Sequence, residues 1–270
     1  MRLIGVMTPI LRPLHRQYIR MCLEQTKDQP NVIHSISAEY TGPLHFTRFW
    51  LQTVAEWEAE TGHHPLIALS CTKDVQDSIL ADPILNKVVD IIDIRYWHYN
   101  TKGLWAPEGG RNMAPRQWMR KMKVGKTGFE EAYRAVREYR ERYPEKAVTF
   151  FSQQYPTYGW AILMAGGSLP NVPLTSHPSP ITSHLLKDLN QMKPMDAEGC
   201  LVLADAQTGY LVYPTAEQVS LPVAAGKYHI YTIDTKSGTI KLLKKSTRLE
   251  IFKPNAPKSN SVYWLRAIRK

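Results

Sequence analysis

The chain has 270 residues, of which 43% are hydrophobic and 21% charged, a balance that excludes fibrous and wholly disordered proteins. No stretch approaches the about 20 apolar residues that a membrane span needs. The first residues also lack the apolar run and the cleavage site of a secretory signal. The sequence therefore predicts one large domain or two smaller ones, with no membrane span, and it leaves the cellular location open.

The formal net charge is +10, and its densest cluster runs from Arg111 to Lys126 without an acidic residue. Clustered Lys and Arg can bind the phosphates of nucleic acids. A single cationic stretch is more typical of a solvated loop. We therefore expect no nucleic-acid partner, and keep nucleic-acid binding as a third hypothesis.

Cysteines and histidines give no sign of a disulfide framework or a metal site. Cys22, Cys71 and Cys200 are far apart and odd in number, which predicts buried thiols. The histidines show no metal-ligand spacing, and no Gly-rich phosphate-binding motif occurs. The sequence predicts no metal and no cofactor.

Helices and strands alternate over the first two thirds of the chain. Apolar residues at helical spacing predict helices over 13–27, 46–61, 74–80, 129–143 and 158–165. Short apolar runs predict strands over 31–37, 65–70, 88–94 and 147–151. This alternation, without hairpin signals, is typical of βαβ units and a mostly parallel sheet.

The pattern changes near residue 195. Short strands separated by turn residues are predicted over 200–204, 209–213, 219–222, 227–234, 240–243 and 262–267. Such a series is typical of a small all-β sandwich. We therefore predict two domains, residues 1–195 and 196–270.

Candidate site residues follow from the rule that ligands of parallel α/β folds bind beyond the carboxyl ends of the strands. The residues at these ends are Glu39, Tyr40, Lys73, Asp74, Asp93, Arg95, Tyr96, Trp97, Gln153 and Gln154, and Trp105 follows in a long aromatic connection. Carboxylates can protonate a glycosidic oxygen, and aromatic rings can stack on sugars. The combination indicates a carbohydrate ligand.

For two of these acidic residues, Asp74 and Glu39, a helix-capping role is the alternative to a functional one, and the two differ in how well it fits. Asp74, directly before Val75, also fits the N-cap of a helix. Glu39 precedes Tyr-Thr-Gly-Pro43 and so lies in an irregular turn, where a carboxylate has less reason to cap a helix. Position alone therefore favours a functional role for Glu39.

Four segments resemble a known family. His15–Ile19 and Asn31–Tyr40 resemble the stretch around strand four of (β/α)8 glycoside hydrolases, and Gly159–Ser168 is similar to their segment between strands seven and eight. The tail over 200–269 resembles the collagen-binding-like β-sandwich that follows the barrel in apiosidase-like bacterial glycosidases. The resemblance implies a partial TIM-type (β/α)8 barrel followed by a small all-β sandwich. It also implies Glu39 as the acid/base, in a family that is usually secreted or periplasmic.

The chain departs from that family in two ways. Gln153 and Gln154 stand where the family has a glutamate nucleophile, and a neutral amide cannot act as that carboxylate. Either Asp93 takes the role, or the mechanism inverts with a water between the carboxylates, or the chain is inactive. Residues 1–195 also provide too few strands for a closed barrel of eight. We expect a truncated or internally started product that covers the second half of a longer enzyme.

The leading hypothesis is a glycoside hydrolase that cleaves O-glycosidic bonds of a polysaccharide. Glu39 would act as acid/base, Asp93 as the second carboxylate, and the other candidates would bind the sugar. The alternative is a non-catalytic carbohydrate-binding or structural protein that retains the cleft. The sugar, the linkage and the oligomeric state stay open.

Overall fold

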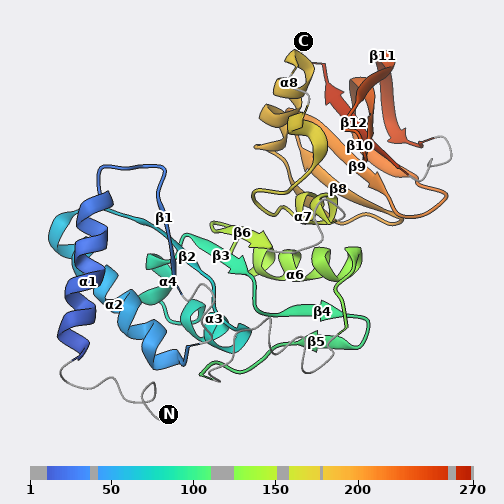
Figure 1. The fold of residues 1–270 in the computed structure, drawn as a ribbon. Helices are drawn as coiled ribbons and strands as arrows, with labels where there is room; N and C mark the ends of the chain where they lie inside the picture. The colour runs from blue at the N-terminus through green and yellow to red at the C-terminus, as the bar shows by residue number, and fades with distance from the viewer. Residues whose placement is uncertain are drawn as a thin grey trace. The chain divides into compact units, whose positions relative to one another are not determined.

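A computed structural model describes residues 11–36, 42–110, 125–150, 158–176, 179–254 and 260–268. The chain forms two compact units, residues 1–152 and 153–270. The first contains a parallel sheet and the second an antiparallel sheet (Figure 1). Among the described residues, no helix is both long and apolar enough to cross a membrane.

The first unit is built on a parallel sheet with the strand order β1-β2-β3-β6. Its strands are β1 (Ile33–Ile36), β2 (Leu66–Leu69), β3 (Ile91–Ile94) and β6 (Ala147–Phe150). Its helices are α1 (Leu11–Thr26), α2 (Leu44–Thr61), α3 (Lys73–Leu80), α4 (Leu85–Val88) and α6 (Phe129–Arg142), and a hairpin of β4 (His98–Asn100) and β5 (Gly103–Trp105) follows β3. The predicted mixed α/β fold with a parallel sheet is confirmed. A TIM-type barrel is not confirmed, because the described parallel sheet has four strands.

The two faces of the parallel sheet differ in burial. Alternation along the strands places Leu69, Ile92 and Val148 in one row, and all three are fully buried. The opposite face begins with Ile33 and Leu66, which are 46% and 38% exposed. The apolar face therefore forms the core of this unit, and the other face carries the polar groups of the candidate site.

The second unit is built on an antiparallel sheet with the strand order β11-β10-β12-β9-β8-β7. The strands are β7 (Lys193–Met195), β8 (Cys200–Asp205), β9 (Gly209–Pro214), β10 (Leu221–Asp234), β11 (Ile240–Phe252) and β12 (Ser261–Ala267). Before them come α7 (Gly159–Met164), the 3-10 helix η1 (Pro173–Ser176) and α8 (Pro180–Leu189). Apolar side chains that include Val202, Val212, Ile230 and Leu265 form a core on one face of the sheet. The described strands form one sheet, so a two-sheet sandwich is not confirmed.

Gly209 begins β9 at a point where only glycine fits. Its φ is 111°, a conformation that L side chains rarely adopt, and a Cβ atom there would lie 2.0 Å from the carbonyl oxygen of Leu265. The close approach lets β9 pair with β12, with Gly209 opposite Arg266.

Several elements differ from the prediction. The predicted strands over 219–222 and 227–234 are one strand, β10, and β11 continues to Phe252 instead of ending at residue 243. The β4–β5 hairpin, α8 and β7 were not expected. Long paired strands survive turn-like residues because the cross-strand hydrogen bonds continue past register shifts, as they do between β10 and β11.

The segment after residue 152 packs with the antiparallel sheet. The Trp160 indole donates to the carbonyl oxygen of Thr235 at 2.9 Å, and Arg266 Nε lies 3.3 Å from Asp188 Oδ2. The compact units thus divide earlier in the chain than residue 195. The predicted domains 1–195 and 196–270 stay a prediction.

All three cysteines are free thiols. Cys71 and Cys200 are buried, whereas Cys22 is partly exposed. The expectation of buried thiols is therefore correct for two of the three.

Candidate active site

The candidate site lies where the parallel strands of the first unit end. Because β1, β2, β3 and β6 run parallel, their carboxyl ends share one edge of the sheet. Asp93 in β3 pairs in register with Thr149 in β6, and both side chains therefore lie on the same face. Ser70 directly follows β2, and Arg95 directly follows β3.

Asp93 is the centre of a polar row on this face. Its carboxylate accepts hydrogen bonds from Ser70 Oγ at 2.5 Å, Arg95 Nε at 2.8 Å and Thr149 Oγ1 at 2.9 Å. Since Ser70 donates to Asp93, the Ser35 hydroxyl 3.0 Å away is oriented to donate to Ser70. The row crosses all four strands and holds the Asp93 carboxylate, 5% exposed, in one orientation.

Gln76 ties the ends of β2 and β3 together behind this row. Its Nε2 donates to the carbonyl oxygens of Leu69 at 2.6 Å and Asp93 at 3.0 Å. Its Oε1 accepts from the Trp97 indole at 2.9 Å. A fully buried amide whose donors and acceptor are all used fixes the backbone on either side of the candidate carboxylate.

Lys73 and Trp97 belong to a second polar cluster, between α3 and α6. Lys73 Nζ lies 3.0 Å from Asp77 Oδ2 and 2.8 Å from Glu138 Oε1, and it sits 4.7 Å from the centre of the Trp97 ring. Lys73 and Trp97 are only 8% and 2% exposed. These contacts favour a structural role, and the predicted sugar-binding role of both residues stays a prediction.

Two phenols complete this second cluster. Tyr139 donates to Asp77 at 2.7 Å, and burial followed by the neighbouring Asp77 charge raises its pKa strongly. Tyr99 donates to Glu138 at 2.7 Å, and burial followed by that hydrogen bond raises its pKa to about 12. Both phenols therefore stay protonated donors at neutral pH.

The remaining described candidates lie in or beside the connection after β3. The Asp74 carboxylate accepts from the Gly109 amide at 3.0 Å, in the first turn of α3, whose N-cap is Thr72 rather than Asp74. Trp105 is partly buried in β5 with its ring 5.1 Å from that of His98, and Tyr96 is buried. Asp74 thus fixes the loop after β5 to α3.

Four predicted site residues, Glu39, Tyr40, Gln153 and Gln154, lie outside the described residues, as does most of the cationic stretch over 111–126. Their roles stay predictions. No group of three or more potential metal ligands occurs in the part of the chain that the structure describes.

Sequence reasoning missed the hydroxyls that surround Asp93. Ser35, Ser70 and Thr149 are far apart in the chain, and only the pairing of the strands brings them together. The available signal was a polar residue within or just after each short apolar strand. Such a residue is expected to lie at the carboxyl edge of a parallel sheet.

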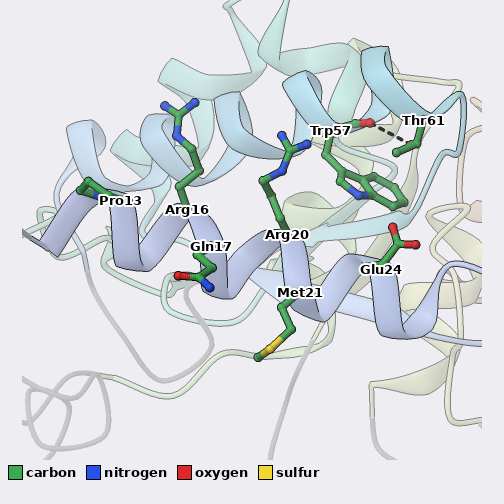
Figure 2. Close-up of a pocket in the computed structure, with 8 residues that line it drawn as sticks. All are labelled: Pro13, Arg16, Gln17, Arg20, Met21, Glu24, Trp57 and Thr61. Atoms are coloured by element: carbon green, nitrogen blue, oxygen red, sulfur yellow. Dashed lines mark hydrogen bonds between the residues drawn. The ribbon is translucent and has the colours of Figure 1, made fainter.

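A groove of about 570 Å³ lies between α1 and α2, away from the polar row. Figure 2 shows the side chains of Arg16 and Arg20 extending from α1. Arg16 forms an ion pair with Glu56 of α2, and Arg20 forms one with Glu60 of α2. The hydrogen bond to Glu60 raises the pKa of the Arg20 guanidinium. The groove is therefore lined partly by apolar side chains, Pro13, Met21 and Trp57, and partly by the two arginines that pair with α2.

Comparisons with known proteins give a fold and a family. No curated protein matches the sequence. A solved structure titled "Glycoside hydrolase" has a TM-score of 0.57 and 13% identity, and the match covers 95% of this chain and 69% of that chain. The fold therefore resembles that of a glycoside hydrolase. A second solved structure, a GH30 endoxylanase from Clostridium papyrosolvens C71, has a TM-score of 0.45 and 12% identity, and the match covers 96% of this chain and 72% of that chain.

The apiosidase-like relationship and the collagen-binding-like tail stay predictions. The family model that matches is described as "Domain of unknown function (DUF6298)", and it matches residues 3–192. Since this match spans more than half of the sequence, the chain belongs to the DUF6298 family.

Proposed function

We propose that the chain is a glycoside hydrolase that cleaves O-glycosidic bonds in a polysaccharide, with Glu39 as acid/base and Asp93 as the second carboxylate. The observation that carries this proposal is the polar row around Asp93, placed at the carboxyl edge of a parallel sheet. That edge is where α/β folds bind their ligands. The likeness of the fold to a glycoside hydrolase supports the same reading.

The chemistry divides between the two carboxyl groups. Glu39 would donate a proton to the glycosidic oxygen as the bond to the leaving group breaks. Asp93 would attack the sugar directly or deprotonate a water, depending on its distance from Glu39. Ser70, Arg95 and Thr149 would hold Asp93 in place, because a reacting group must keep its orientation to be effective.

Sugar binding would use the side chains around this edge. Arg95, whose side chain is 31% exposed, and the partly buried Trp105 have surface that a ligand can reach. The remaining candidates of the proposed site are Tyr40, Lys73, Asp74, Tyr96, Trp97, Gln153 and Gln154. Among them, Lys73, Asp74 and Trp97 would act by holding the wall of the site through their contacts with protein.

One observation favours a second candidate function, carbohydrate binding without catalysis. Asp93 is 5% exposed, and both of its carboxylate oxygens already accept hydrogen bonds. A nucleophile needs an oxygen that can reach the sugar. In the second candidate, Asp93 would instead fix Arg95 as a sugar ligand.

Turnover by variants of the full chain tests the proposal. Glu39→Gln should lower the release of reducing sugar from a responsive polysaccharide at least about 100-fold, since proton transfer contributes about that much. Asp93→Asn should lower it by a similar factor. Thermal unfolding of each variant shows whether a loss of activity follows from a loss of folding.

Glu60→Gln is the matched control, because it neutralises an exposed carboxylate in α2 and should leave turnover unchanged. Full activity of Glu39→Gln would contradict the assigned acid/base. If the wild-type chain binds oligosaccharides but releases no product across plant and microbial polysaccharides, the second candidate replaces the first. If it neither binds nor cleaves them, both are wrong.

A further inference from the structure

The antiparallel sheet of the second unit has one face that changes character along its strands. Directly paired residues of neighbouring strands lie on the same face, so the register defines rows across β11, β10 and β12. One row joins Tyr231 to Trp264, the next joins His229 to Arg266, and the third joins Lys227 to Arg248. Alternation along β10 puts these three rows on one face.

The aromatic row is packed, whereas the row of Lys227 and Arg248 is exposed. Trp264 is fully buried, and the Tyr231 ring stacks on it with 4.8 Å between the ring centres. Lys227 and Arg248 are both exposed. Along this face, a fully buried Trp264 stacked on a partly exposed Tyr231 is thus followed by the two exposed cations Lys227 and Arg248.

The charges on this face are poorly balanced. Arg266 pairs with Asp188 and lies over the Trp264 ring, 5.6 Å from its centre. For Lys227 and Arg248, no carboxylate among the described residues lies within ion-pair distance, and the nearest acidic residue along β11 is Glu250. Like charges directly opposite each other in an antiparallel pair are destabilising.

We propose that this face, formed by Lys227, His229, Tyr231, Arg248 and Arg266, binds an acidic polysaccharide. A carboxylate or sulfate bound between Lys227 and Arg248 would remove their repulsion and form charge-assisted hydrogen bonds with both. The partly exposed Tyr231 ring, on the same face beyond the row of His229 and Arg266, offers an apolar surface for a sugar ring of the same polymer. Charge and ring surface together match a sugar that carries an anionic group.

The same features disfavour a nucleic acid. Single-stranded nucleic acids stack successive bases on several aromatic side chains. Here the rings of Tyr231 and Trp264 already stack on each other, and Trp264 has no exposed surface. The choice of a polysaccharide over other polyanions also rests on the proposed glycosidase function.

Affinity electrophoresis of the full chain in gels with polygalacturonate or with a neutral galactan tests this inference. The wild-type chain should be retarded by polygalacturonate but not by the neutral galactan. Retardation should fall as the salt concentration rises, because binding releases cations condensed on the polymer and added salt opposes that release. Lys227→Gln combined with Arg248→Gln should weaken binding about tenfold, equivalent to about 1.4 kcal/mol. Tyr231→Leu should weaken it less.

Lys236→Gln combined with Lys253→Gln is the matched control, since it removes two exposed cations of the same unit outside these rows. An equal loss in both double variants would overturn the proposal, because binding would then follow net charge alone. Absence of retardation in the wild type, or tighter binding of single-stranded DNA than of polygalacturonate, would also overturn it.

A further variant separates this inference from the proposed activity. Glu39→Gln should keep full retardation by polygalacturonate, because the cationic face belongs to the second unit. If the wild-type chain binds polygalacturonate through Lys227 and Arg248 but hydrolyses no glycoside, the proposed activity is wrong and the binding face stands. If the wild-type chain hydrolyses a glycoside but is not retarded by polygalacturonate, the proposed activity stands and the binding face is wrong.

Discussion

The two sheets of this chain differ in how their charged side chains are compensated. In the parallel sheet, Asp93 is buried, and its carboxylate accepts from the hydroxyls of Ser70 and Thr149 and from Arg95, which directly follows the same strand. In the antiparallel sheet, Lys227 and Arg248 face each other in solvent without a described acidic partner. A buried charge must be paired because desolvation is costly, whereas an exposed one can be left for a ligand. The comparison teaches that the protein itself compensates the charge of Asp93, whereas the charges of Lys227 and Arg248 are left for a ligand to compensate.

The largest effect is expected where a buried cation is removed from the first unit. Lys73→Met leaves Asp77 and Glu138 without the cation that lies within 3.0 Å of both. We expect the free energy of unfolding to fall by about 3 kcal/mol, the lower end for a broken buried pair because both carboxylates retain some exposure. Urea unfolding at neutral pH measures this loss.

Lys87→Met, in α4, is the control for Lys73, because Lys87 is exposed. Without Lys73, the two carboxylates keep only the more distant Arg142, 4.0 Å from Asp77 Oδ1 and 3.6 Å from Glu138 Oε1. Adding Asp77→Asn and Glu138→Gln to Lys73→Met should therefore recover part of the stability, since the poorly compensated charges are then gone. A loss below about 1 kcal/mol in the single variant would mean that Arg142 and water compensate the two carboxylates, and that this cluster behaves like an exposed ion pair.

An intermediate effect is expected for the segment that joins the second unit before residue 195. Trp160→Phe removes the hydrogen bond from the buried indole to Thr235 and leaves that carbonyl without its donor. The cost should be about 1 to 2 kcal/mol, and it should reach the strands of the antiparallel sheet. Amide hydrogen exchange should show faster exchange in β10 and unchanged exchange in β2 and β3.

Trp105→Phe is the complementary variant, because Trp105 lies in the first unit. It should leave exchange in β10 unchanged. If Trp160→Phe instead speeds exchange in β2 and β3, the segment over 158–176 is coupled to the parallel sheet, and the earlier division of the chain at residue 152 is wrong.

The smallest effect concerns pH. His64 lies 2.9 Å from Asp90 Oδ1 and 2.6 Å from Glu58 Oε1, and the hydrogen bond to Asp90 raises its pKa. A His whose pKa is raised in the folded state stabilises the fold. This stabilisation is fully present below the unfolded pKa of about 6.5 and is lost as the pH rises through the folded pKa. The His64 side chain is 52% exposed, so solvent screening limits the effect to about 0.5 kcal/mol.

Urea midpoints at pH 5.5 and 8.5 measure this difference. The wild type should lose its advantage over His64→Gln at the higher pH. A constant difference for His64→Gln would show that its contacts with Asp90 and Glu58 do not depend on the imidazolium charge.

The order of helices and strands in the first unit could be predicted because apolar spacing is a local property. The helix over 180–189 was missed although Ser179 and Pro180 are a suitable N-cap and first-turn pair, and Ser179 does accept from the Thr182 amide. The β4–β5 hairpin was hidden in a stretch read only as a long loop. Its two strands have three residues each and carry little periodic signal.

The candidate site was less predictable than the fold. Asp93 and Arg95 could be found because they close a predicted strand. That Ser70 and Thr149 contact Asp93 depends on register between strands that are more than 20 residues apart in the chain, and no local pattern specifies it. The pairing of Lys227 with Arg248 was hidden for the same reason.

The edge strand β11 bears on whether the chain self-associates. Thirteen residues long and lying at the sheet edge, it exposes Leu242 and Leu243 by about half, a surface that could template intermolecular strand pairing. Three register shifts against β10 and the left-handed φ of 51° at Ser246 distort that edge, and lysines flank the leucines. Irregular geometry and like charge together make a second β11 a poor partner, so the strand protects the chain against self-association while it stays open to solvent.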